Sequence, residues 1–204
     1  MDNNTNFSAE ESLLLINTMI AKAKNNFAEN GHLYLLWGWV VFVCGLLEFV
    51  LLHFFNYREH YQVWMITWLV FIYQIFYLRK LDKQKSVKTY YNEVIGYVWT
   101  SFVAAMFLLG FAITSTSSIF PKYYQLFTPC ILVMYGIPVF LSGILLRFKP
   151  LIIGGIGCWL LSLAASISLV TLSYQYQLLF IPAAMLVAWI IPGYIMRKKY
   201  LQTN

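Results

Sequence analysis

Six runs of mostly apolar residues occupy most of this chain and decide what it can fold into. They cover about residues 33–55, 61–78, 94–113, 126–146, 151–171 and 177–196. Roughly 20 such residues cross the hydrocarbon core of a bilayer as a helix. The alternating pattern of membrane strands is absent. The sequence therefore predicts an all-α membrane protein, a six-transmembrane-helix bundle.

The composition agrees with lipid as the main solvent. Only 11% of the 204 residues are charged and 60% are hydrophobic, whereas soluble domains average about 25% charged residues. The net charge of +6 would suit nucleic acid, but no nucleic-acid-binding motif is present. Because most basic residues fall on one side of the predicted bundle, the lipid bilayer and its anionic lipids are the expected partners.

The basic residues also predict an orientation. Of the 14 lysines and arginines, only Arg58 and Lys122 fall on the side opposite the rest. By the positive-inside rule, both termini then face the cytoplasm. Residues 147–150 divide an apolar stretch that is too long for one span, so a hairpin turn is expected there. The expected headgroup anchors are Arg79, Lys80, Arg147, Lys149, Arg197 and Lys198.

Three segments follow from this pattern: residues 1–32, the six-helix domain 33–196, and a basic tail 197–204. Ser8 and Glu11 form a capping-box pattern, and apolar residues then recur at helical spacing up to Phe27. This predicts a cytoplasmic N-terminal amphipathic helix. It either lies on the membrane surface or against the bundle, or forms a coiled-coil seam, for which its two heptads are short.

Glu48 is the one acid well inside a predicted span. It shares a helix face with Gly38 and Gly45, and small residues mark close helix contacts, so its side chain is expected to point into the bundle. A carboxyl inside a membrane is costly and is a hypothesis for a functional site.

Two interpretations of Glu48 stay open. In one, its carboxyl binds a proton or a ligand in a cavity lined also by Tyr135, Ser162 and Ser166. In the other, it is neutral and hydrogen-bonded to a hydroxyl, or reaches outward toward His53 and Arg58. No metal site or other cofactor is expected, because no pair of ligands has i, i+4 spacing.

Small residues predict where helices pack closely. Gly154, Cys158, Ser162 and Ser166 recur at four-residue intervals, which favours a packing face over a polar pathway. The stretches "GWVVFVCGLL" and "GIPVFLSGIL" place paired glycines in the first and fourth spans, and suggest an inverted repeat. The expected packing glycines of these two stretches are Gly38, Gly45, Gly136 and Gly143.

Prolines fall in or near the fourth and sixth spans. Each removes a backbone hydrogen bond and can kink its helix, and broken helices line many transporter sites. The four residues are Pro129, Pro138, Pro182 and Pro192.

No signature of catalysis is present. The sequence lacks HExxH, GxSxG, paired intramembrane aspartates and a phosphate-binding loop. A lone glutamate has no partner for acid–base chemistry. The protein is therefore not expected to be an enzyme.

The stretches "YLLWGWVV", "GYVW", "SGILLRFKPLIIGGIGCW" and "IPGYIMR" resemble an uncharacterised family of small bacterial six-span integral membrane proteins with an amphipathic N-terminal helix. The resemblance implies a topology and the inner membrane of a bacterium, but no site residues. The favoured function is binding or transport of a small molecule or lipid through a cavity near Glu48. The alternative is a regulatory or interaction protein that acts through its N-terminal helix and basic loop, and a homo-oligomer stays open.

Overall fold

The computed structural model describes the backbone of residues 9–84 and 90–202, with the side chains of Leu14, residues 31–81, Lys83 and residues 93–202. Within these ranges the regular elements are all helices, as the sequence predicts. They are α1 (Ala9–His53), η1 (His60–Met65), α2 (Ile66–Gln84), α3 (Tyr90–Ile119), η2 (Pro121–Leu126), α4 (Phe127–Leu145), α5 (Lys149–Ser168), α6 (Tyr174–Gln177), α7 (Phe180–Met185), η3 (Leu186–Ile190) and α8 (Ile191–Leu201).

Six segments of the described chain are long and apolar enough to span a membrane. They are Gly31–His53, His60–Leu81, Glu93–Ile119, Pro121–Leu145, Lys149–Ser168 and Tyr174–Leu201. Successive segments run in opposite directions. We call the end of the bundle that carries Arg79, Lys80, Arg147, Lys149 and residues 197–199 the basic end, and the end that carries residues 54–59 and 169–173 the opposite end.

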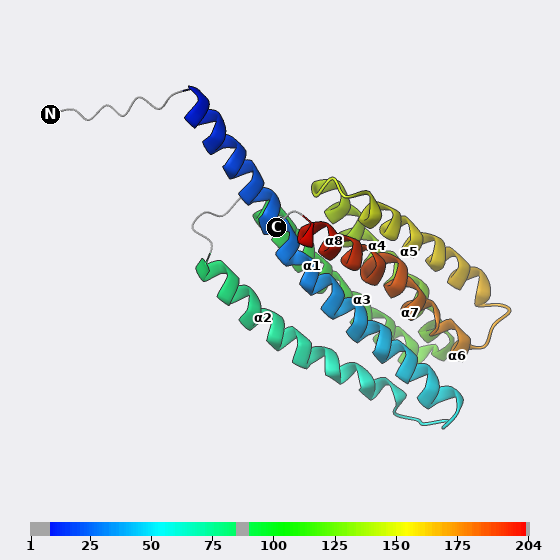
Figure 1. Ribbon diagram of the computed structural model, residues 1–204. Helices are drawn as coiled ribbons and strands as arrows, with labels where there is room; N and C mark the ends of the chain where they lie inside the picture. Colours follow the sequence, from blue (N-terminus) through cyan, green and yellow to red (C-terminus); the bar gives the residue numbers. More distant parts are fainter. Residues whose placement is uncertain (1–8, 85–89, 203–204) are drawn as a thin grey trace.

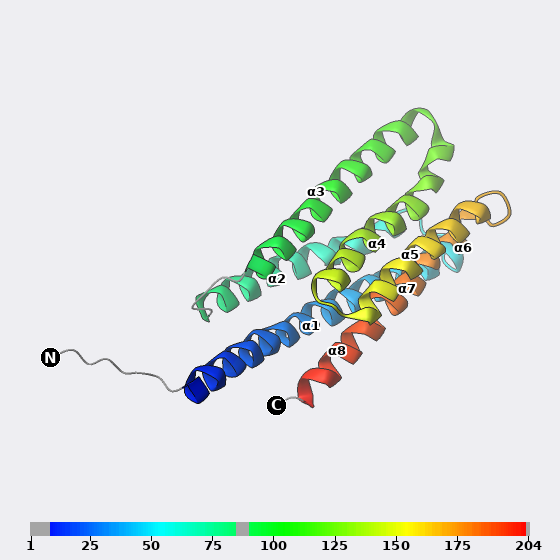
Figure 2. The same cartoon turned by 90° about the horizontal axis from the view of Figure 1, so that it is seen from above.

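The core of the bundle is formed by α1, α4, α5 and the sixth segment. The α4–α5 hairpin is its most extensively packed part, and α1 lies against α7, η3 and α8. α2 packs mainly against α1, and α3 mainly against α4, and none of their described side chains is fully buried. Figure 1 shows α2 at one edge of the bundle and the α4–α5 hairpin at the other, and Figure 2 shows α3 along one side.

The charged stretch between the fourth and fifth segments is a tight turn, as predicted. The amide of Phe148 donates to the carbonyl of Gly143 over 2.9 Å, and Arg147 has a left-handed backbone with φ of 48°. Pro150 falls in the first turn of α5, where its missing N–H removes no helical hydrogen bond. Arg147 and Lys149 therefore lie at the basic end and not in the core.

The N-terminal segment differs from the expected separate helix. α1 is one helix of 45 residues, so no break separates residues 9–32 from the first span. Its first turns continue in line with the span and extend beyond the ends of the other helices (Figure 1). Ser8 lies outside the described residues, and so does the side chain of Phe27 with the rest of the expected apolar stripe.

The sixth segment is interrupted twice. Residues 178–179 form a turn between α6 and α7, and η3 is a π-helical turn between α7 and α8. Pro182 follows the first interruption and Pro192 the second. Proline has no backbone N–H, so it cannot donate a hydrogen bond to the preceding helical turn. By contrast, α4 continues through Pro138. The two irregular turns are of interest because π-helical turns and broken helices are frequent at functional sites.

Glycines allow close approach to the π-helical turn from two sides. A Cβ on Gly154 of α5 would lie 2.8 Å from the Cα of Ala188, and one on Gly38 of α1 would lie 3.0 Å from the Cβ of Trp189. Gly45, Gly136 and Gly143 also face neighbouring residues closely. The glycines named from the sequence thus lie at helix contacts, and Cys158 between them is fully buried.

Candidate functional site around Glu48

Glu48 lies on the buried face of α1 toward the opposite end of the bundle. Only 3% of its surface is exposed. Its carboxylate has two partners: Nδ1 of His60 lies 2.9 Å from Oε1, and Nε1 of Trp64 donates to Oε2 over 2.8 Å. An ionised carboxylate only accepts, so Nδ1 of His60 carries the hydrogen in that state. Both carboxylate oxygens are therefore engaged.

Both partners of Glu48 belong to η1, the short helix that leads into α2. Cys44, one turn earlier on α1, faces the same helix, with its Sγ 3.7 Å from the carbonyl of Val63. Glu48 therefore ties the start of the second segment to the core.

These partners correct one sequence-based expectation. Glu48 bonds neither to a hydroxyl nor to His53 or Arg58. His53 instead stacks on Phe49, with ring centroids 5.2 Å apart, and shares a hydrogen bond with Gln175. The described lysines and arginines make no ion pair with Glu48, so His60 is the only basic group at the carboxylate.

Two more buried polar side chains lie at the same depth as Glu48. Gln177 and Thr128 have no exposed surface, and neither the Gln177 amide nor the Thr128 hydroxyl has a hydrogen-bond partner among the described residues. Burying such groups unpaired costs about 1–3 kcal/mol each. Unpaired buried groups of this kind are candidates for binding a ligand or an ordered water.

Two contacts place Glu48, Thr128 and Gln177 along the axis of the bundle. The rings of Tyr124 and Tyr174 lie 5.3 Å apart, and Thr128 and Gln177 follow them on segments that run in the same direction. A Cβ on Gly45 would lie 3.0 Å from Pro182. Glu48 is three residues from Gly45 and Gln177 five from Pro182, both toward the opposite end. The Tyr174 hydroxyl is also close enough to be influenced by the charge of Glu48. We call Glu48, His60, Trp64, Thr128 and Gln177 the acidic layer.

The other residues named from the sequence do not join this layer through any described hydrogen bond. Ser162 donates to the carbonyl of Pro129 over 2.8 Å, and Ser166 donates to the carbonyl of Ser162 over 2.9 Å. Tyr135 is buried between the rings of Phe102 and Trp189, at 5.5 and 6.3 Å. Ser162 thus fastens α5 to α4, and Tyr135 belongs to the aromatic core.

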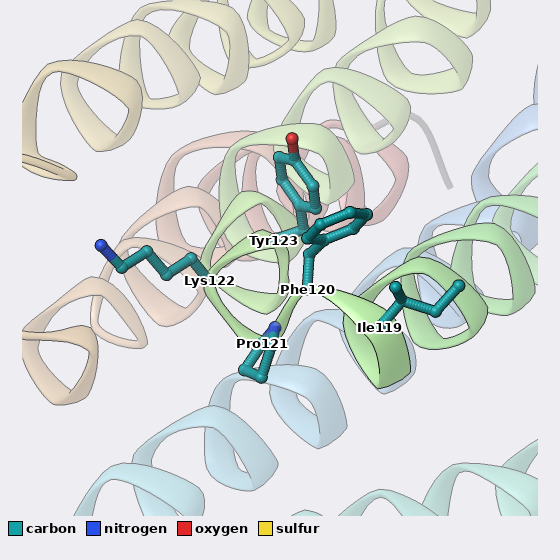
Figure 3. A pocket seen from close by; sticks show the side chains of 5 residues that line it. All are labelled: Ile119, Phe120, Pro121, Lys122 and Tyr123. Atoms are coloured by element: carbon teal, nitrogen blue, oxygen red, sulfur yellow. The ribbon is translucent and has the colours of Figure 1, made fainter.

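The most distinct hollows of the described residues lie away from the acidic layer. The larger, of about 390 Å³, is lined by residues 119–123 in the turn between α3 and α4. Figure 3 shows it from close by, with the Lys122 side chain directed away from the ring of Tyr123. The smaller, of about 210 Å³, lies beside it and is lined by Ala112, Ile113, Thr116, Tyr123 and Leu126. Neither hollow is lined by Glu48, whose side chain is buried.

The described residues contain no group of three or more histidine, cysteine or acidic side chains placed to hold a metal ion. Comparisons with protein-family models, curated proteins and solved structures found no match to this chain. The resemblance to a bacterial six-span family therefore stays a prediction, and the chemistry of the site rests on its own residues.

Sequence reasoning found Glu48 but missed its partners. His60 and Trp64 read as interfacial residues, because a histidine or tryptophan near a span end is usually part of the aromatic belt. Gln177 stands between Tyr176 and Leu178 and reads as the last polar residue of a loop. The available signal was its position directly before an apolar run that contains Pro182.

Proposed function

We propose that the protein is an integral membrane protein of a bacterial inner membrane, with both termini and the basic end in the cytoplasm. Six helices of sufficient length and apolar character support a membrane location. The orientation rests on the gathering of lysine and arginine at one end, which the positive-inside rule assigns to the cytoplasm. The anchors at that end are Arg79, Lys80, Arg147, Lys149, Arg197 and Lys198. In this orientation the acidic layer lies in the outer half of the bilayer.

Within this frame, we propose that the protein binds a small cationic molecule, such as a lipophilic amine, in the acidic layer, and moves it across the membrane. The observation that carries the proposal is the buried carboxylate of Glu48, which has one imidazole and one indole as partners and no lysine or arginine. When His60 is neutral, the layer has a net negative charge in a low-dielectric setting, where a cation is strongly favoured.

The surroundings also suit an amine. The rings of Trp64, Tyr124 and Tyr174 lie near the carboxylate, and aromatic faces attract cations. The amide of Gln177 and the hydroxyl of Thr128 are buried without partners, so they can accept the hydrogens of an ammonium group. A neutral ligand of the same shape would leave the carboxylate unpaired.

Access to the layer follows from the position of its hydrogen bonds. Because both donors to Glu48 come from η1, a ligand or proton that takes their place on the carboxylate releases the start of α2. A hydrogen bond between α1 and α2 nearer the basic end, from Trp37 to Gln74 over 2.6 Å, does not involve Glu48. The outer part of α2 would then swing away from α1 and open the layer from the side.

Calorimetry with the full chain in lipid nanodiscs tests this function. We expect benzylamine to bind, and benzyl alcohol, which has a similar shape and no charge, not to bind above the level of empty nanodiscs. Glu48→Gln should weaken binding about tenfold or more, which is the effect of losing one charge-assisted hydrogen bond. Glu93→Gln is the matched control, because Glu93 is exposed at the start of α3.

Equal affinity of the wild type and Glu48→Gln for benzylamine would overturn the proposal.

A second function is favoured by one observation, the extension of α1 beyond the other helices (Figure 1). We propose as the alternative that this part of α1 engages a partner or a second copy of the chain, and that the protein is regulatory. Removing residues 1–24 separates the two functions. Loss of a homo-oligomer in light scattering with unchanged benzylamine binding would assign the oligomer to α1 and leave transport in the acidic layer.

A further inference from the structure

A second group of buried, unpaired polar atoms lies nearer the basic end, in the aromatic core. The Tyr34 hydroxyl, the Ser142 hydroxyl and the indole N–H of Trp189 have no hydrogen-bond partner among the described residues. At most 5% of the surface of each residue is exposed. They come from three elements, α1, α4 and η3. Unpaired buried donors in three neighbouring elements need an explanation beyond local packing.

Ring contacts bring these groups together. Trp189 lies between Tyr34 and Trp99, with ring centroids 5.5 and 5.1 Å away, and Tyr34 and Trp99 are 6.0 Å apart. The hydroxyl of Tyr34 lies close to Ser142 and to the indole of Trp99, but the contacts of the Tyr34 and Ser142 hydroxyls do not have the distance and angles of a hydrogen bond. We call Tyr34, Trp99, Ser142 and Trp189 the donor cluster.

The π-helical turn places Trp189 in this cluster. Gly38 leaves room for the tryptophan, since a Cβ there would lie 3.0 Å from the Cβ of Trp189. Gly154 allows α5 to close behind the same turn, at Ala188. A helix that keeps a π-helical turn usually does so for a functional reason, because the turn is less stable than an α-helical one.

The chemistry of the cluster is that of a hydrogen-bond donor set. Indole N–H groups only donate, and the hydroxyls of serine and tyrosine can donate. The acids with described side chains, Glu48, Glu59 and Glu93, do not belong to the cluster. Ser142 is about one helical turn before Arg147, and Lys149 follows, so the nearest charged residues along α4 and its turn are positive.

We propose that the donor cluster is a binding site for a compact monovalent anion of halide size, for which chloride is the natural candidate. Neighbouring donors in a low-dielectric setting, with no acid of the described side chains among them, favour an anion. The three residues with unpaired donors are at most 5% exposed, and the rings of the cluster pack against each other, which suits a compact anion. This site is separate from the acidic layer in residues and in ligand charge, and it does not depend on the proposed transport of amines.

Thermal unfolding of the full chain in detergent, at constant ionic strength with chloride or gluconate, tests the site. A ligand that binds the folded state raises the melting temperature in a saturable way. We expect chloride to do so and gluconate, which is too large, not to. Trp189→Phe keeps the ring and removes the N–H, and it should raise the half-saturating chloride concentration about tenfold or more.

Because the chloride effect is measured within each variant, a change in basal stability does not obscure it. Ser142→Ala should weaken chloride binding in the same way. Trp159→Phe is the matched control, since its indole N–H already donates to the carbonyl of Val133, and it should keep the wild-type response. Bromide should also give an anomalous scattering peak beside Trp189 in crystals.

Equal melting temperatures in chloride and gluconate would overturn the proposal and leave ordered water as the occupant. A wild-type chloride response in Trp189→Phe would also overturn it. Neither result bears on benzylamine binding, so the two sites are tested independently.

Discussion

Nδ1 of His60 in η1 lies 2.9 Å from Oε1 of Glu48 in α1, and this contact holds the start of the second segment, at the opposite end of the bundle, against the core. Their side chains are 4% and 12% exposed, respectively. The contact joins residues of consecutive segments across a short loop. The buried carboxylate of Glu48 is therefore both the group proposed to bind a ligand and the group that attaches the start of α2 to α1.

Removing the carboxylate should loosen this attachment. Glu48→Ala leaves the donors of His60 and Trp64 without their acceptor, which costs about 3–6 kcal/mol for two hydrogen bonds to a charged group. The loss is measured as a lower unfolding free energy in mild detergent. A double-mutant cycle with His60→Ala should give a coupling energy above about 0.5 kcal/mol. Additive effects of the two changes would contradict the proposed attachment.

Close packing at the π-helical turn predicts a second effect. In Gly154→Ala the new methyl group would lie 2.8 Å from the Cα of Ala188. Because backbone cannot move aside cheaply, we expect a loss of about 1–3 kcal/mol. Gly96→Ala is the control, since no atom lies within 4 Å of a Cβ there, and alanine is the better helix former. Equal unfolding temperatures for the two variants would show that α5 and η3 are less tightly packed.

Much of the fold could be predicted from the sequence, because the patterns that decide it are local. Apolar runs set the spans, and the turn at Arg147 follows from charge and proline within a few residues. The π-helical turn could not be predicted, because it depends on how α1 and α5 meet the sixth segment at Gly38 and Gly154. The continuity of α1 was missed because polar composition before residue 33 indicates the membrane boundary and not the end of a helix.

Of the candidate site, Glu48 could be predicted from the sequence and its neighbours could not. Glu48 was visible because a carboxylate in an apolar run is rare. Tyr135, Ser162 and Ser166 were named as its neighbours on composition alone, and their hydrogen bonds and ring contacts lie elsewhere. Which polar side chain meets Glu48 depends on the relative depth of separate helices, and a sequence pattern does not specify that depth.

Ser162 therefore serves as a test of the boundary of the site. Ser162→Ala removes the hydrogen bond to the carbonyl of Pro129, so we expect a loss of about 1 kcal/mol in unfolding free energy. Benzylamine affinity should stay at the wild-type value, measured by the calorimetry described above. A drop in affinity comparable to that of Glu48→Gln would extend the site to α5.

Replacing Gln177 should change the stability of the protein and its affinity for benzylamine in opposite directions. Its amide is fully buried and without a partner, so it costs the folded protein free energy unless a ligand or water binds there. Gln177→Leu keeps a similar volume and removes the unpaired groups, and we expect the ligand-free protein to gain about 1–3 kcal/mol in unfolding free energy. The same variant should bind benzylamine more weakly, because the acidic layer loses an acceptor.

Gln175→Leu is the control. Gln175 shares an exposed hydrogen bond with His53, so this variant should neither gain unfolding free energy nor lose benzylamine affinity. If Gln177→Leu destabilises the protein in the absence of benzylamine, the amide has a structural partner and its place in the acidic layer is wrong.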